Sequence, residues 1–157
     1  MRQSFTKSLV DLAGKDPRII LLTVDVGYGV LEPFVEKYPD RFIDSGISEA
    51  NTIGVATGMA LKGKIPFVYS INSFLLFKGL EQIRMLADMG PQVVLVGVGK
   101  DREYTNFGLT HYSFGDEAIL ATIPIKVLTP EKKSDVEMIV DEAYNNHGPS
   151  YIRLSRF

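Results

Sequence analysis

Strand-sized apolar runs recur along the chain and alternate with longer stretches of helical periodicity. The runs cover residues 19–24, 66–70, 92–98, 125–128 and 150–154. Because runs that are apolar on both faces suit strands buried in a parallel sheet, we expect each of them to be such a strand. Amphipathic stretches predict helices at residues 2–14, 49–62, 74–89, 115–121 and 131–146. The alternation predicts an α/β fold, a single three-layer domain with a mainly parallel sheet of about six strands and helices on both faces.

Length and composition restrict the possible functions. The chain has 157 residues, of which 45% are hydrophobic, and this suits one domain over residues 1–157. Its 17 basic and 19 acidic residues form no basic block, so nucleic acid is not an expected partner. Cysteine is absent, and the apolar runs are far shorter than the ~20 residues that span a bilayer. We therefore expect a cytoplasmic protein without disulfides or a membrane partner.

Candidate functional residues are those that follow the predicted strands, because ligands of open parallel sheets bind at the carboxyl ends of the strands. Four segments are expected there, at residues 25–29, 44–49, 70–77 and 99–113. The chain has no glycine-rich nucleotide loop, no His-Glu-x-x-His zinc motif and no Gly-x-Ser-x-Gly elbow. The side chains in these four segments therefore have to supply the chemistry.

Glu49 is the first candidate. Ser48 suits the N-cap of the helix that begins here, which puts Glu49 in the first turn. One interpretation is a carboxylate that the helix dipole stabilises. The other interpretation follows from the small residues of this helix, which allow close packing on both sides: Gly54, Ala56, Gly58 and Ala60. Such packing would bury Glu49, and a buried carboxylate needs a partner.

Two aromatic residues and a histidine follow on the later strand ends. Phe74 and Phe77 lie three residues apart where a helix begins, so they share one face of that helix. They either pack in the core or form the floor of a site for a flat ligand ring. His111 ends a long polar loop, where it is either structural or accessible to a substrate. Histidine is the side chain best suited to proton transfer near neutral pH.

Five segments occur in a characteristic order. They are Gly-Ile-Ser-Glu-Ala-Asn at 46–51 with the small-residue helix after it, the aromatic segment ending at 77, Gln-Ile-Arg at 82–84, Gly-Leu-Thr-His at 108–111 and Ile-Pro at 123–124. With these segments the whole chain resembles the pyrimidine-binding (central) domain of the transketolase family, whose enzymes depend on thiamine diphosphate. The resemblance implies the thiamine diphosphate-binding fold.

The resemblance also assigns cofactor contacts. It implies that Glu49 is catalytic and hydrogen-bonds the aminopyrimidine ring of thiamine diphosphate. Phe74 and Phe77 match positions whose rings pack on the aminopyrimidine, and Ile47 completes the implied cofactor-binding set. The resemblance implies no metal ligand in this chain.

Two further residues match substrate positions. His111 matches a catalytic histidine that contacts the substrate near its reacting oxygens, and Arg156 matches an arginine near the substrate phosphate. Phe107 stands where relatives that act on sugars usually have an aspartate. The resemblance therefore implies a small keto substrate and leaves its identity open.

The Gly-Asp-Gly motif, with which the family holds Mg²⁺ and the diphosphate, does not occur in this sequence. The resemblance therefore implies a split enzyme, a homodimer or heterotetramer in which a separate subunit carries the diphosphate-binding domain and Mg²⁺. It would be a transferase that moves a ketol or acyl unit through a thiamine-bound carbanion. Two alternatives stay open: a 2-oxo acid decarboxylase or dehydrogenase subunit, and a non-catalytic dimerisation or regulatory remnant of a transketolase.

Overall fold

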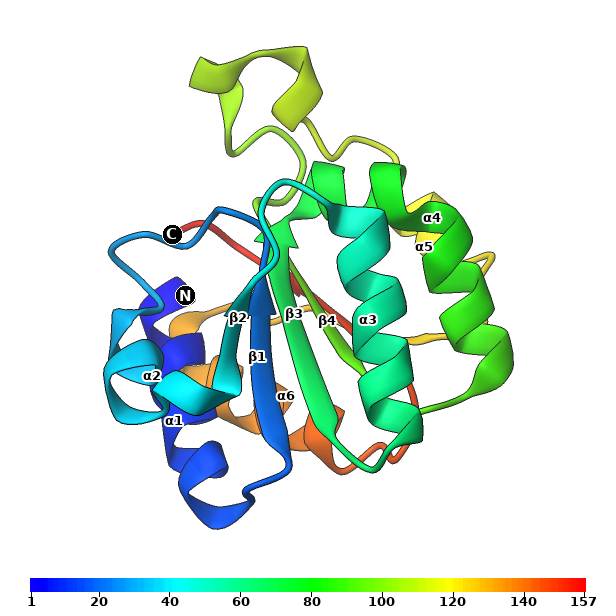
Figure 1. Ribbon diagram of the computed structural model, residues 1–157. Coiled ribbons are helices and arrows are strands. Elements are labelled where there is room, and N and C mark those ends of the chain that lie inside the picture. Colours follow the sequence, from blue (N-terminus) through cyan, green and yellow to red (C-terminus); the bar gives the residue numbers. More distant parts are fainter.

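A six-stranded sheet runs through the centre of the computed structural model, which describes residues 1–157 (Figure 1). The strand order is β2-β1-β3-β4-β6-β5, and every neighbouring pair is parallel. The strands are β1 (Ile19–Thr23), β2 (Phe42–Asp44), β3 (Ile65–Ile71), β4 (Val94–Val98), β5 (Lys126–Leu128) and β6 (Ser150–Leu154). The structure confirms the predicted α/β fold with six parallel strands.

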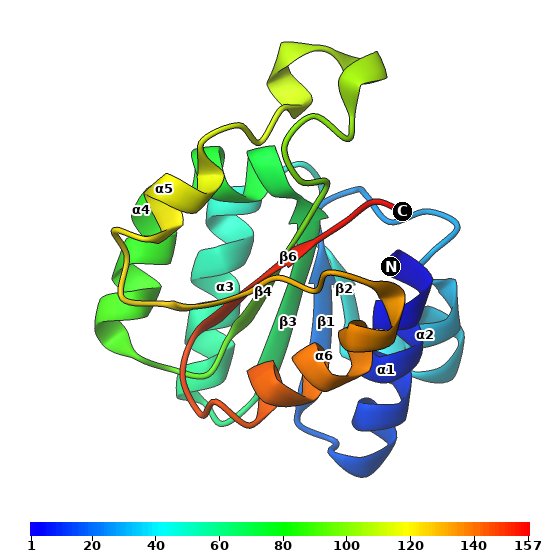
Figure 2. The ribbon, with the colours of Figure 1, turned by 180° about the vertical axis from the view of Figure 1, so that it is seen from behind.

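Helices cover both faces of the sheet, as Figure 1 and Figure 2 show from opposite sides. One face carries α1 (Arg2–Lys15), α2 (Glu32–Lys37) and α6 (Val136–Tyr144), and the other carries α3 (Glu49–Leu61), α4 (Asn72–Met89) and α5 (Asp116–Leu120). Side chains of β1 alternate between two apolar layers, with Ile19 and Leu21 in the first and Ile20 and Leu22 in the second. This alternation is the physical reason why the run is apolar throughout.

Short elements differ from the sequence-based expectations. The helical periodicity does not reveal α2, because its six residues make less than two turns. The helix expected from residue 131 begins at Val136 instead. A 3-10 turn, η4 (Lys133–Asp135), takes up the preceding residues, and the carboxylate of Asp135 accepts a hydrogen bond from the backbone N–H of Lys132 at 3.2 Å.

The connection between β4 and α5 stands out from the rest of the molecule, at the top of Figure 1 and Figure 2. It contains two 3-10 turns, η2 (Thr105–Phe107) and η3 (Leu109–His111), and a third such turn, η1 (Pro39–Arg41), precedes β2. Ser113 joins the two ends of this loop, because its hydroxyl donates to the backbone oxygen of Gly99 at 2.8 Å. None of the helices combines the length and the apolar character that crossing a membrane requires.

Candidate active site

The four candidate segments lie at the same edge of the sheet, since the strands before them are parallel. The first two segments are joined directly. Oδ1 of Asp44 accepts hydrogen bonds from the backbone N–H groups of Asp25 at 2.9 Å and of Gly46 at 3.0 Å. Gly46 has a φ of +66°, a conformation that glycine adopts without strain. These contacts shape the turn that leads into α3.

Glu49 is the first residue of α3, as expected, and only 5% of its surface is exposed. Its carboxylate makes no hydrogen bond within the chain, and its charged neighbour is Lys78, whose Nζ lies 3.9 Å from Oε1. Ser48 is the N-cap residue of α3, as expected, but its side chain makes no capping hydrogen bond. Its hydroxyl instead donates to the backbone oxygen of Ser45 at 3.0 Å, because the turn brings that carbonyl within reach. The buried carboxylate thus has an ion-pair partner in Lys78 and no hydrogen-bond donor within the chain.

Apolar side chains surround this end of α3 and α4. Phe74 is half-buried, and the Nζ of Lys78 lies 4.3 Å from the centroid of its ring. Phe77 is 43% exposed and Ile47 is 74% exposed, so neither is a core residue of this chain. The structure therefore rejects the core-packing interpretation for Phe77 and leaves its ring available to a ligand or a second chain.

His111 reaches this region from the protruding loop. Its ring centroid lies 4.7 Å from that of Phe74, with the two ring planes at 64°. The ring of Phe107 lies 5.2 Å away and that of Tyr104 lies 6.1 Å away, and Nδ1 is 3.1 Å from the hydroxyl of Thr110. Phe74 follows β3 and His111 follows β4, so the fold brings residues from two strand ends into direct contact.

Arg156 lies on the other side of the same aromatic group. Its guanidinium carbon is 4.7 Å from the ring centroid of Tyr104 and 5.8 Å from that of Phe107. Arg156 also lines a pocket of about 360 Å³ together with Arg2 and Lys133. Sequence reasoning missed these two cations, because α1 and η4 carry them and no local pattern connects them with Arg156. Three basic side chains in one pocket, whose lining also includes the terminal residues Met1 and Phe157, suit an anionic group.

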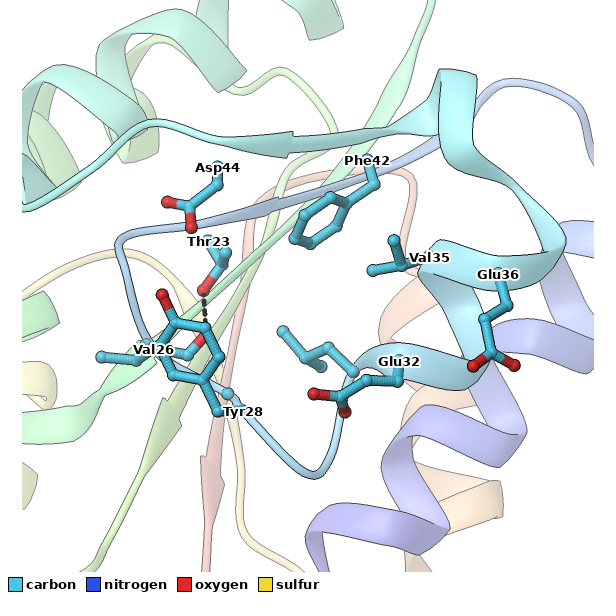
Figure 3. Close-up of a pocket in the computed structure, with 10 residues that line it drawn as sticks. Thr23, Val26, Tyr28, Glu32, Val35, Glu36, Phe42 and Asp44 are labelled. Carbon is cyan, nitrogen blue, oxygen red and sulfur yellow. Dashed lines mark hydrogen bonds between the residues drawn. The ribbon is translucent and has the colours of Figure 1, made fainter.

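A second cavity, of about 230 Å³, opens between β1, β2 and α2 (Figure 3). Its walls include the apolar residues Val26, Leu31, Val35 and Phe42, and its lining carries three carboxylates, those of Glu32, Glu36 and Asp44. No basic residue lines it, and none of the predicted site residues lies in it. An excess of negative charge makes this cavity unsuitable for a diphosphate or another anion.

The residues around Glu49 fit one end of thiamine diphosphate. A flat aminopyrimidine ring needs apolar surfaces on its faces and a carboxylate for its ring nitrogen, and Phe74, Phe77 and Glu49 offer these. The chain contains no group of three or more His, Asp or Glu side chains that could hold a metal ion.

Comparison with known proteins agrees with this geometry. The sequence profile of the family "Transketolase, pyrimidine binding domain" matches residues 1–157. The chain belongs to this family. It is 32% identical over 158 residues to a subunit of the apulose-4-phosphate transketolase of Phocaeicola vulgatus, covering 99% of this chain and 51% of that protein. It is 34% identical over 159 residues to "6-deoxy-6-sulfo-D-fructose transketolase subunit SqwH" of Clostridium sp. (strain MSTE9), covering 99% of this chain and 49% of that protein.

Two solved transketolase structures share the fold of this transketolase pyrimidine domain. "Split gene transketolase, inactive beta4 tetramer" superimposes with a TM-score of 0.87 at 30% identity, covering 99% of this chain and 51% of that chain. Transketolase from Leishmania mexicana superimposes with a TM-score of 0.87 at 21% identity, covering 99% of this chain and 25% of that chain, and supports the fold. The chain spans about half the length of the two curated relatives.

Proposed function

We propose that residues 1–157 form the pyrimidine-binding domain of a split, transketolase-like enzyme whose active site is completed by a separate diphosphate-binding subunit. The observation that carries this proposal is Glu49, a buried carboxylate without a hydrogen bond in its own chain, which Lys78 links to Phe74, whose ring contacts His111. Two relatives named as transketolase subunits support the division between chains.

Thiamine diphosphate is the proposed cofactor, with its Mg²⁺ and diphosphate held by the partner subunit. Glu49 would bind the aminopyrimidine, while Phe74, Phe77 and Ile47 would pack on it and exclude water. When bound, the cofactor supplies the electron sink that ketol transfer requires. The chain's own contribution is to orient the pyrimidine and to hold a proton at the carboxyl group of Glu49.

The proposed substrate is a small keto compound with an anionic group. His111 would contact the substrate near its reacting carbonyl, and Arg156 with Arg2 and Lys133 would bind the anion. The names of two relatives include a phosphate and a sulfo group, respectively, which supports a substrate of this charge. Tyr104 and Phe107, which lie between His111 and Arg156, would line the path between the two ends of the substrate.

Assembly into a homodimer or heterotetramer is part of the proposal. A groove of about 300 Å³ lies between α3 and α4, lined by small and apolar residues that include Gly54, Gly58, Leu61, Met85 and Met89. A Cβ atom at Gly54 or Gly58 would meet nothing within 4 Å, so this side of α3 is open in the single chain. We propose that a helix of another subunit packs there, and the tetramer among the similar solved structures supports this.

Glu49→Gln tests the proposed function. In a complex with a chain that carries the Gly-Asp-Gly motif, proton NMR follows exchange of the C2 proton of thiamine diphosphate with solvent. The nearly isosteric variant should fold and assemble, yet lose most of the exchange, because an amide cannot hold the required proton. Glu81→Gln removes an exposed carboxylate from α4 and should exchange at the wild-type rate.

Each outcome bears on one claim. Exchange at the wild-type rate in Glu49→Gln would leave Glu49 as a helix-terminus carboxylate without a catalytic role. Cofactor binding and full exchange by this chain alone would contradict the need for a diphosphate-binding partner.

A further inference from the structure

A buried polar cluster lies beneath the loop that carries His111. Its members are Asn72 at the start of α4, Asp116 at the start of α5, and Tyr151 and Arg153 on β6, all of them almost fully buried. The proposed function assigns a role to none of them. A buried charge costs free energy unless it is paired and hydrogen-bonded. The hydrogen bonds of this cluster therefore fix α4, α5 and β6 relative to one another.

Asp116 is the centre of the cluster. Its Oδ2 accepts hydrogen bonds from Nδ2 of Asn72 at 2.5 Å and from Nε of Arg153 at 2.7 Å. Its Oδ1 accepts from Nη2 of Arg153 at 3.0 Å and from the backbone N–H of Glu117 at 2.9 Å. Four donors thus engage one carboxylate, and removing any of the side chains leaves a buried polar group without its partner.

Asn72 is held from its other side as well. Its Oδ1 accepts a hydrogen bond from the hydroxyl of Tyr151 at 2.7 Å. Gly97 on β4 provides the space, because a Cβ atom at this position would collide with both the Asn72 side chain and the Tyr151 hydroxyl. The amide is therefore fixed in one orientation, and it ties the start of α4 to the start of α5.

The hydrogen bond between Asn72 and Asp116 connects the two segments that carry the proposed site residues. Asn72 stands two positions before Phe74, and Asp116 stands five positions after His111. The rings of Phe74 and His111 touch at a centroid distance of 4.7 Å. Residues 105–110 of the loop are exposed, and segments with few buried contacts open at low free energy. Ser113, two positions after His111, ties the end of this loop to Gly99, and Asp116 ties the segment that follows to the start of α4.

We propose that Asp116 is a positioning residue, which holds His111 against Phe74 through its hydrogen bond to Asn72. Asp116 is buried in the chain and acts through the placement of His111. A misplacement of about 1 Å at a reacting group costs about a hundredfold in rate. The catalytic meaning of this placement rests on the proposed function, whereas the placement itself is a property of the chain alone.

Proton NMR of the histidine rings in the 157-residue chain tests the proposal, because the chain has only two histidines. Three aromatic rings surround His111, and their ring currents displace its signals: Phe74, Tyr104 and Phe107. His147 is exposed and has no aromatic ring beside it, so it serves as the internal reference. All spectra are compared at one alkaline pH.

Asn72→Ala removes the link to Asp116 and leaves the ion pair between Asp116 and Arg153 intact. The His111 signals should lose most of their displacement, and the His147 signals should stay in place. Asn146→Ala is the matched control, because its Nδ2 donates to the backbone oxygen of Pro149 at 3.3 Å and to the hydroxyl of Ser150 at 3.1 Å, next to His147. This control should leave the His111 signals unchanged.

Asp116→Ala removes the acceptor of the same link, together with the ion pair to Arg153. The double variant with Asn72→Ala should move the His111 signals no further than the more severe single variant, because both changes remove one shared contact. A folded Asn72→Ala chain with wild-type His111 signals overturns the proposal. If the Asn72→Ala chain does not fold, heating the wild-type chain tests the proposal instead. The His111 displacement should last until global unfolding, and its loss at a lower temperature overturns the proposal.

These spectra need neither cofactor nor partner. If Glu49→Gln exchanges the C2 proton at the wild-type rate, the catalytic proposal fails while the His111 signals still report on Asp116. If the His111 signals fail to respond, the role of Asp116 is lost and the test of Glu49 stands.

Discussion

The Nζ of Lys78 lies 3.9 Å from Oε1 of Glu49 and 4.3 Å from the centroid of the Phe74 ring, so one ammonium group contacts both the carboxylate and the ring. A flat ring bound to Glu49 and packed on Phe74 would have to displace it. Because a half-exposed ion pair contributes about 0.2–1 kcal/mol, Lys78→Met should tighten cofactor binding by about two- to fivefold. Calorimetric titration of the assembled complex measures this change.

Lys62→Met is the control for this prediction. Lys62 is exposed at the carboxyl end of α3, away from Glu49, and its removal should leave the cofactor affinity unchanged. Weaker binding in Lys78→Met would show that the ammonium group holds the cofactor and does not compete with it.

His111→Ala should lower the turnover of the assembled enzyme by roughly ten- to a thousandfold, the range for one positioned catalytic group. The affinity for the cofactor should barely change, because His111 contacts Phe74 from the loop side and does not touch Glu49. Steady-state kinetics and cofactor titration separate the two effects. His147→Ala removes an exposed histidine and should retain wild-type turnover. An equal loss of cofactor binding in His111→Ala would assign it a structural role.

Gly58→Leu should stabilise the single chain and weaken its association. A Cβ atom at Gly58 meets nothing within 4 Å, and glycine inside a helix costs about 0.5–1 kcal/mol relative to a good helix former. Overpacking at a helix–helix contact costs about 1–3 kcal/mol, which corresponds to roughly a ten- to hundredfold weaker association. Light scattering over a range of concentrations measures the assembly.

Asp141→Leu adds the same side chain at an exposed position of α6, on the opposite face of the sheet, and should leave the assembly intact. A Gly58→Leu chain that assembles like the wild type would exclude the α3–α4 groove as an interface.

Asp16 makes the stability of the fold depend on pH. Hydrogen bonds from the Arg18 guanidinium hold the pKa of Asp16 well below its ordinary value. The folded-state pKa is depressed, so the stabilisation is complete above the unfolded pKa of about 3.9 and is lost as the pH falls toward the folded value. Asp16→Asn should lower the free energy of unfolding by about 1–2 kcal/mol at neutral pH, a modest loss because Arg18 is 57% exposed and solvent screens the pair.

Urea unfolding at about pH 7 and about pH 3 checks this dependence. The difference between wild type and Asp16→Asn should shrink at the lower pH, because Asp16 takes up a proton in the unfolded state there while its lowered pKa keeps it ionised in the folded state. A difference that is equal at both values would show that Asp16 acts through packing and not through its charge.

Much of the architecture could be predicted from local patterns. The run at residues 19–24 is apolar on both faces because its strand, β1, has neighbours on both sides and helices above and below. The six-residue α2 and the three-residue β2 escape such reasoning, because too few residues show a period.

The site residues were predictable in type and in local position. Glu49 does begin α3, because the small residues after it form a helix and residues 45–48 form the preceding turn. The role of Ser48 was not predictable, since a serine at this position can donate to a carbonyl of the turn as readily as it can accept from a helix N–H.

The sequence by itself determined the α/β class, the order of the longer strands and helices, and the family pattern around Glu49, Phe74 and His111. The tertiary structure alone decided that Phe74 meets His111, that Arg2 and Lys133 share a pocket with Arg156, and that Asp116 joins Asn72 to Arg153. The physical reason is distance along the chain. Periodicity records which face of an element is buried, whereas the pairing of buried polar groups depends on which distant elements the sheet order places side by side.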